Sequence, residues 1–254
     1  MKHSKKILVL LSTLPLFLLG CNSSTDSGMT GDIIGYANLV DLNGALVSDS
    51  GVTIAIEGTS IKTTSAKDGR WVLSSVPTGT YSIVFSDSGY GTFKRNGFQV
   101  VGSGQVFYNF QAQNPWMVTP QSIYKIPNFT IANFLASTTS TGINLGGSFA
   151  GTLPSGTHYL RFFVGTTPDV SSDPSKYSLS VPTGGSSSST SFSTTISSAT
   201  LGASGVGITS GQTVYIVAYA EGSWPNSYVD FATGRDYYPD LNPNHSIVLT
   251  VVVP

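Results

Sequence analysis

The sequence predicts an all-β protein built from two tandem antiparallel β-sandwich domains. Short segments alternate apolar and polar residues with a period of two, which is the pattern of half-buried strands. Turn-forming pairs such as Asn43-Gly44 and Asp68-Gly69 separate these segments. Only 10% of the 254 residues are charged, and 28 glycines and 13 prolines interrupt the chain. No stretch of the first half shows a convincing helical period, so strands are expected throughout.

The chain begins with a short basic and apolar segment. Lys2, Lys5 and Lys6 precede the largely apolar residues 7–20, and the segment ends Leu18-Leu19-Gly20-Cys21. A membrane-spanning helix needs about 20 apolar residues. Because this stretch is shorter, we expect a cleaved export signal rather than a permanent span.

The end of this segment resembles the lipobox of bacterial lipoproteins. That resemblance implies that a signal peptidase recognises Leu18, Leu19 and Gly20, that residues 1–20 are removed, and that Cys21 receives a diacylglyceryl group. Two acyl chains are enough for stable anchoring, so the resemblance implies a membrane partner and attachment to the bacterial cell envelope, at the outer membrane. The alternative is an ordinary secretory signal, but Cys21 is the only cysteine of the chain.

The mature chain would carry a formal charge of −4, from nine Lys and Arg against 13 Asp and Glu. It therefore has no basic field, and we expect no nucleic-acid partner. Residues 21–30 are small and polar, and we expect a flexible tether there.

Residues 31–113 are predicted to form the first sandwich, with alternating strands at 52–57, 70–73 and 80–86. An ordered series of motifs resembles the carboxypeptidase regulatory-like, transthyretin-like domain: Gly35, Asp41-Leu42-Asn43-Gly44, residues 51–59, residues 67–73, residues 76–81 and Gly89-Tyr90. This resemblance implies a fold rather than a catalyst. Glu57 is expected on the solvent face of its strand.

Residues 114–128 are predicted to be a stiff linker. They contain Pro115, Pro120 and Pro127, and proline removes backbone donors and disfavours sheet pairing.

Residues 129–254 are predicted to form the second sandwich, of the fibronectin type III or immunoglobulin-like class. Residues 208–220 are similar to the penultimate strand of fibronectin-like domains. The last strand is apolar on both faces and could pair with a neighbour if it lies at an edge. Its strands are expected at residues 143–149, 159–164, 177–181, 192–201, 214–220 and 247–253.

The polar residues favour a protein that is not an enzyme and that needs no cofactor. His158 and His245 lack the spacing of a zinc site, and no Gly-x-Ser-x-Gly motif marks a nucleophile. Glu57 and Glu221, the only glutamates, are expected in different domains, which disfavours a paired-carboxylate hydrolase. No catalytic residue is therefore predicted.

A calcium site would have to be assembled from scattered aspartates. Their spacing lacks the dense alternation of a calcium loop, so surface acids without a metal are expected. The aspartates in question are Asp169, Asp173, Asp230, Asp236 and Asp240.

Residues 221–245 form the one candidate ligand loop. Long connections in compact domains are uncommon and often functional, and aromatic faces beside polar groups suit sugars or protein partners. Alternatively, Tyr228 and Phe231 pin this loop to the core or form an extra hairpin. The candidate ligand residues are Trp224, Tyr228, Arg235, Asp236, Tyr237 and Tyr238.

Two functions follow. The first is a lipid-anchored, non-catalytic envelope module for adhesion or assembly, with a protein partner. The second is a carbohydrate-binding lipoprotein that captures glycans with residues 221–245.

Overall fold

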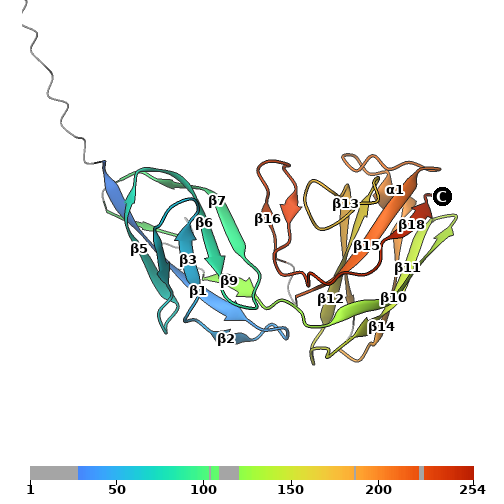
Figure 1. Ribbon diagram of the computed structural model, residues 1–254, viewed down its shortest axis with the longest axis horizontal. Coiled ribbons are helices and arrows are strands. Elements are labelled where there is room, and N and C mark those ends of the chain that lie inside the picture. Colours follow the sequence, from blue (N-terminus) through green and yellow to red (C-terminus); the bar gives the residue numbers. More distant parts are fainter. Residues whose placement is uncertain (1–27, 103, 109–119, 186, 223–225) are drawn as a thin grey trace, which may run out of the picture.

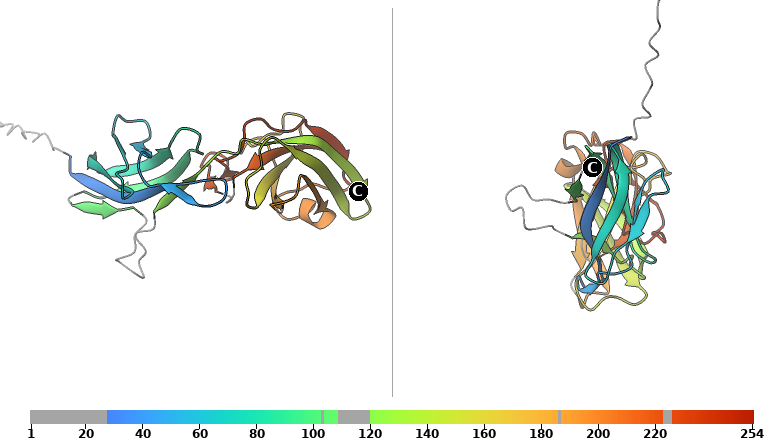
Figure 2. Two further views of the ribbon diagram at one scale, coloured as in Figure 1. Left: turned by 90° about the horizontal axis from the view of Figure 1, so that it is seen from below. Right: turned by 90° about the vertical axis from the view of Figure 1, so that its left-hand side faces the viewer.

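The computed structural model describes residues 28–102, 104–108, 120–185, 187–222 and 226–254. Two β-sandwiches follow one another along the long axis of the molecule, with the start of the described chain at one end and the C-terminus at the other (Figures 1 and 2). The all-β prediction is confirmed: among these residues the single α-helix is the one-turn α1 (Ser198–Leu201). No helix in the described part of the chain is long and apolar enough to span a membrane.

The first sandwich packs two sheets against each other. One has β1 (Thr30–Val40) at its centre, with β2 (Leu46–Ser48) and β5 (Arg70–Pro77) antiparallel to it and β8 (Gln105–Phe107) and β9 (Gln121–Tyr124) parallel to it. The other sheet has the order β4-β3-β6-β7. Its strands are β3 (Thr53–Ile56), β4 (Lys62–Thr64), β6 (Gly79–Ser86) and β7 (Phe93–Val100).

The alternation predicted for 52–57 is present in β3. Val52, Ile54 and Ile56 are buried, whereas Glu57 is exposed and pairs with Lys94 on β7. The predicted solvent-facing position of Glu57 is therefore confirmed. The buried side chains of both sheets meet around Trp71, whose ring packs edge-on against Phe85.

The centre of the core requires a glycine. Gly35 on β1 lies directly under Trp71, and a Cβ at this position would fall 2.4 Å from Trp71 Cζ2. Trp71 is 1% exposed. The glycine at the start of the motif series therefore serves the packing of the tryptophan.

Part of the predicted linker 114–128 belongs to this sandwich. Residues 121–124 form β9, which pairs with Ala37–Val40 of β1, and Ile123 is fully buried in the first core. The linker prediction is wrong for these four residues. Two prolines, Pro120 and Pro127, flank β9 without interrupting it, so they do not remove a donor from its ladder.

The second sandwich consists of the sheets β10-β11-β14 and β13-β12-β15-β18. The phenylalanines of the two sheets meet in its core, where Phe134 stacks on Phe162 at 5.9 Å. The strands are β10 (Thr130–Thr139), β11 (Gly142–Ala150), β12 (His158–Gly165), β13 (Leu179–Gly185), β14 (Ser191–Ser197), β15 (Thr213–Glu221) and β18 (Leu249–Val252).

Three predicted strands of this half end or begin elsewhere, and one of them, expected at 247–253, is β18, which begins at Leu249. The strand expected at 192–201 stops at Ser197, whose Oγ accepts a hydrogen bond from the Thr200 N–H and caps α1. The strand expected at 177–181 begins at Leu179, because Tyr177 turns into a smaller cluster around Phe163. Among the described strands, the C-terminal strand β18 pairs only with β15 and is an edge of its sheet.

Loops of both sandwiches contact each other at the junction. Asn43 Oδ1 accepts hydrogen bonds of 3.0 Å from Ser155 Oγ and from the Gly156 N–H. Gly91 packs on the backbone of Pro239, where a Cβ would approach the Pro239 carbonyl to 2.8 Å. These contacts hold the two sandwiches in one arrangement.

Candidate functional site

Residues 228–237 of the candidate ligand loop form a hairpin that lies between the two sandwiches (Figure 1). Its strands are β16 (Tyr228–Val229) and β17 (Asp236–Tyr237), which pair antiparallel. Asp230 closes the turn: its Oδ1 accepts hydrogen bonds from the N–H and hydroxyl of Thr233, and its N–H donates to the Arg235 carbonyl. The hairpin alternative left open by the sequence is thus what the structure shows.

One side of this hairpin contacts the first sandwich. Tyr228 packs edge-on against Phe93 of β7 at 5.7 Å. Asn96 Nδ2, also on β7, donates a 3.0 Å hydrogen bond to the Val229 carbonyl. This ring contact and this hydrogen bond connect the hairpin of the second sandwich to strand β7 of the first.

The other side packs on the second sandwich. Arg235 donates from Nη1 to the Tyr177 carbonyl and lies over the Tyr177 ring, and the Tyr177 hydroxyl donates to the Asp236 carbonyl. Tyr238 reaches Ser180, with 2.7 Å between their hydroxyl oxygens. Burial raises the pKa of Tyr177 and Tyr238. These two predicted ligand residues, Arg235 and Tyr238, therefore position the hairpin.

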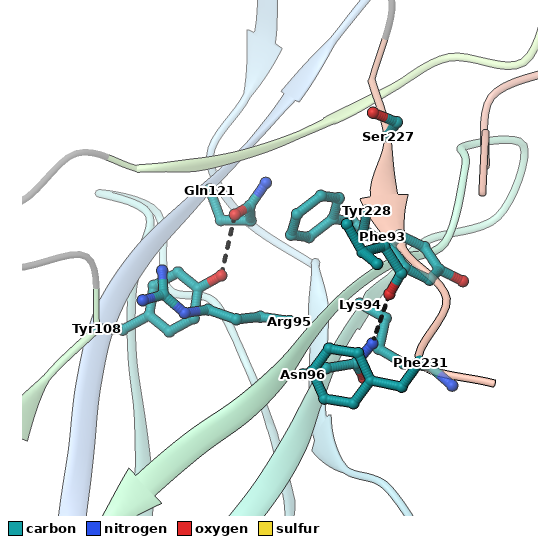
Figure 3. Close-up of a pocket in the computed structure, with 10 residues that line it drawn as sticks. Phe93, Lys94, Arg95, Asn96, Tyr108, Gln121, Ser227, Tyr228 and Phe231 are labelled. Carbon is teal, nitrogen blue, oxygen red and sulfur yellow. Dashed lines mark hydrogen bonds between the residues drawn. The ribbon is translucent and has the colours of Figure 1, made fainter. Parts of the chain in front are cut away.

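A cavity of about 280 Å³ lies between the hairpin and β7 (Figure 3). Phe231 lines this cavity, and 71% of the Phe231 surface is exposed. Tyr108 also lines the cavity, and its hydroxyl donates a hydrogen bond to Gln121 Oε1. Burial raises the pKa of Tyr108 to about 12. The Arg95 guanidinium lies 4.9 Å from the Tyr108 ring centre. The lining is Phe93, Lys94, Arg95, Asn96, Tyr108, Gln121, Ser227, Tyr228, Val229 and Phe231.

This cavity combines aromatic and polar groups from both sandwiches. Phe231 and Tyr228 present apolar surface, while Asn96, Gln121 and Arg95 place amide and guanidinium groups around it. Such a lining can stack on an apolar face and hydrogen-bond its rim, as ligand pockets and interface hot spots do. Of these residues, only Tyr228 was among the candidates taken from the sequence.

A second hollow, of about 540 Å³, lies between the hairpin and the loop 171–175. The loop 171–175, Asp230 and Tyr237 line it, and Tyr237 is 39% exposed. Asp173 and Asp230 have lowered pKa values, because Ser175 and Thr233 respectively donate hydrogen bonds to them.

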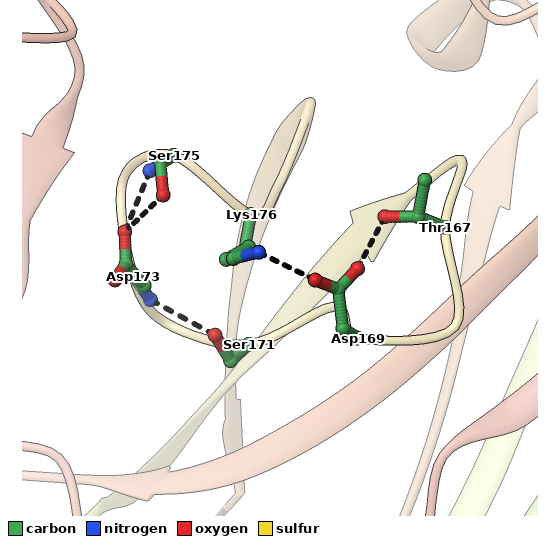
Figure 4. Close-up of polar contacts among 6 residues, drawn as sticks. All are labelled: Thr167, Asp169, Ser171, Asp173, Ser175 and Lys176. Atoms are coloured by element: carbon green, nitrogen blue, oxygen red, sulfur yellow. Dashed lines mark hydrogen bonds and ion pairs between the residues drawn. The ribbon is translucent and has the colours of Figure 1, made fainter.

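The aspartates do not converge on one centre. Asp169 pairs with Lys176 and accepts from Thr167, whereas Asp173 accepts from the N–H and hydroxyl of Ser175 (Figure 4). The bond from Lys176 is the main reason that the Asp169 pKa is lowered to about 2. Within the described ranges, no three His, Cys, Asp or Glu side chains are grouped to hold a metal.

Asp240 departs from the prediction of surface acids. It is fully buried, with no hydrogen-bond partner for either carboxylate oxygen among the described residues. Its pKa is raised well above the usual range, first by burial and then by the neighbouring Glu221. Asp240 precedes Leu241, which forms an antiparallel β-bridge with Glu221 at the end of β15. This bridge places Asp240 in the interior.

An ion pair lies beside Asp240. Arg161 on β12 bonds Glu221 Oε1 at 2.8 Å through both Nε and Nη2, and both side chains are buried. The Arg161 guanidinium also stacks 3.8 Å from the Tyr238 ring centre. Burial raises the Glu221 pKa. The sequence signal for this pair was an arginine in the middle of the apolar run 158–165.

The remaining predicted residues are accounted for as follows. Leu18, Leu19, Gly20, Cys21 and Trp224 lie outside the described residues. His158 is buried against the Phe149 ring, whereas His245 lies beside Tyr219. These histidines belong to separate packing environments.

Residues 38–113 match the carboxypeptidase regulatory-like domain family. No curated protein matches the chain. Solved structures similar to it include a proposed carbohydrate binding protein from Bacteroides uniformis, with 16% identity over 89% of this chain and 100% of the other and a TM-score of 0.32. A DUF3823 family protein from Bacteroides ovatus has 15% identity over 88% of this chain and 98% of the other, with a TM-score of 0.32.

The FN1–FN3 domains of chicken CNTN1 have 11% identity over 89% of this chain and 68% of the other, with a TM-score of 0.31. TM-scores of this size do not establish a shared fold. The domain match covers the motif series of the first sandwich from Asp41 onward, so residues 38–113 are similar to the carboxypeptidase regulatory-like domain family.

Proposed function

We propose that this protein is a lipid-anchored, non-catalytic binding module of the bacterial cell envelope, and that its ligand site is the cavity between β7 and the β16–β17 hairpin. The observation that carries the proposal is the lining of this cavity, to which both sandwiches contribute aromatic and polar groups. A site made at a fixed junction is preorganised, which lowers the entropy lost on binding.

The absence of catalysis is part of this proposal. Two acids that a hydrolase would use are engaged elsewhere, because Glu57 pairs with Lys94 in the first sandwich and Glu221 with Arg161 in the second. The cavity itself offers stacking faces beside the Arg95 guanidinium and the amides of Asn96 and Gln121, which also hold hydrogen bonds within the protein. These groups suit recognition of a partner better than proton transfer.

A glycan is the second candidate for the ligand, beside a protein partner. Sugar C–H faces stack on rings while their hydroxyls pair with amides and guanidinium groups. Phe231 lines the cavity and Tyr237 lines the second hollow, and both are exposed beside polar side chains. This arrangement favours a glycan-capture function for residues 221–245.

The anchor is tested by metabolic labelling with a palmitate analogue. We expect label on the wild-type chain and none on Cys21→Ser, and we expect only the wild type in the membrane fraction. An unlabelled wild-type chain in the soluble fraction would show instead an ordinary secretory signal and refute anchoring.

The ligand site is tested on a glycan array and by capture of envelope proteins, with Phe231→Ala as the variant. Leu135→Ala is the matched control, because Leu135 is 68% exposed on β10, away from the junction. We expect Phe231→Ala to weaken binding about tenfold or more, which corresponds to about 1.4 kcal/mol. Trp224→Ala extends the glycan test. Binding that both Phe231→Ala and the control leave intact would exclude this cavity.

A further inference from the structure

Three segments of the chain lie close together around Gly222, just after β15. The end of β15 supplies Glu221 and Gly222, the chain leaving the hairpin supplies Asp240, and the segment after β9 supplies the carbonyl of Lys125. Lys125 continues the first sandwich, since its N–H donates to the Val40 carbonyl. The position is therefore shared by both sandwiches.

The oxygen atoms that meet here are acceptors. Asp240 Oδ1, Asp240 Oδ2 and Glu221 Oε2 are buried, and apart from a contact between the Asp240 carboxylate and its own N–H they have no hydrogen-bond partner among the described residues. The Cβ position of Gly222 lies 2.8 Å from Asp240 Oδ2 and 3.3 Å from the Lys125 carbonyl oxygen. Both oxygens thus face the same side of Gly222, where any side chain would fill the space.

The charges are also unbalanced. Arg161 directs both of its bonds to Glu221 Oε1, so one guanidinium faces two buried carboxyl groups. Buried charges are normally paired, hydrogen-bonded or bound to a metal. Asp240, which is 0% exposed, forms no ion pair and no hydrogen bond to another residue in the part of the chain that the structure describes, although the charge of Arg161 acts on it.

We propose that Asp240, Glu221 and the Lys125 carbonyl form a buried cation site at the junction, and that its ion is calcium. All three ligands are oxygens, which suit a hard cation. Calcium accepts carboxylates and backbone carbonyls at about 2.3–2.6 Å in irregular geometry, whereas magnesium demands a near-ideal octahedron. Water completes the coordination of a site with two carboxylates and one carbonyl. The ion ties the segment after β9 to the second sandwich.

The test uses the full-length protein purified in detergent, stripped with EGTA and titrated with calcium chloride in a calorimeter. We expect one equivalent to bind and, at a hundredfold excess over the Kd, a rise in Tm of about 5–10 °C. Asp240→Asn should abolish both effects. The matched control Asp173→Asn removes an acid of the 171–175 loop and should leave both unchanged.

Hydrogen exchange of the wild type locates the ion without any variant. Calcium should slow exchange in residues 220–222 and 239–242, and this measurement decides the proposal if Asp240→Asn fails to fold. The proposal is overturned if calcium up to about 10 mM, a concentration well above the Kd of extracellular calcium sites, gives no binding heat and no change in Tm. Undiminished binding by Asp240→Asn, or protection confined to other residues, would also overturn it. The test is independent of lipid anchoring and of the ligand cavity.

Discussion

Replacing Gly35 by alanine should destabilise the first sandwich severely. The new methyl carbon would lie 2.4 Å from Trp71 Cζ2, 2.7 Å from Trp71 Cε2 and 3.0 Å from Tyr108 Cβ. Carbon atoms pack at about 3.5–4.0 Å, so the overlap with Trp71 exceeds 1 Å by this estimate. Relief requires either Trp71 or β1 to move.

Neither can move easily. Trp71 is 1% exposed and is held edge-on by Phe85 and Tyr108. Strand β1 is paired on one edge with β5 and on the other with β8 and β9. Overpacking usually costs about 1–3 kcal/mol, and we expect the upper end, about 3 kcal/mol. For a domain of this size that corresponds to a Tm lower by about 10–20 °C.

Urea unfolding followed by circular dichroism measures this loss. The matched control is Gly146→Ala on β11, where a Cβ would have only the Phe192 carbonyl oxygen nearby, at 3.6 Å. We expect the control within about 0.5 kcal/mol of wild type. A double variant with Trp71→Phe should lose less stability than the two single losses combined, because the smaller ring relieves the overlap. The packing argument is refuted if Gly35→Ala is no less stable than the control.

Three further changes probe the buried charges and the junction. Arg161→Met leaves two carboxyl groups buried without their cation, and should cost about 3–5 kcal/mol in urea unfolding; a loss below about 1 kcal/mol would contradict this. Because the pKa of Asp240 is raised in the folded state, the folded protein keeps a proton that the unfolded chain releases above about pH 4, so the free energy of unfolding in EGTA should fall as the pH rises from there. Asp240→Asn should reduce that slope and leave the smaller part that Glu221 contributes, because the pKa of Glu221 is also raised; an unchanged slope would exclude the Asp240 carboxyl as an origin. Gly91→Ala places a methyl carbon 2.8 Å from the Pro239 carbonyl and should open the junction, which small-angle scattering would detect as an altered profile with unchanged circular dichroism.

The strands with strong local patterns could be predicted from the sequence. In β3 the alternation of Val52, Ile54 and Ile56 reports burial directly, because one face of the strand meets the core. Strand β10 was missed for an equally local reason. Its register shifts between Ala132 and Leu135, and Asn133 has a φ of 49°, so the bulge breaks the period of two.

Features that depend on distant segments could not be predicted. Strand β9 forms because β1, about eighty residues earlier, offers it an edge. The prolines on either side of β9 disfavour a strand when the sequence is considered locally. The aromatic content of residues 221–245 identified an unusual loop, but not that Tyr228 faces the first sandwich and Tyr238 the second. Likewise, nothing adjacent to Asp240 in sequence announces its burial, which follows from the bridge between Leu241 and Glu221.

The parallel pairing of β1 and β9 determines how the molecule bears a mechanical load. The chain enters β1 at Thr30, and it leaves β9 at Tyr124 toward the second sandwich. A force that separates the start of β1 from the second sandwich therefore pulls β1 and β9 along their own axes, in opposite directions. The backbone hydrogen bonds between β1 and β9 are then loaded together in shear, rather than opened one after another like a zipper. The first sandwich should therefore resist unfolding when the molecule is pulled between its two ends.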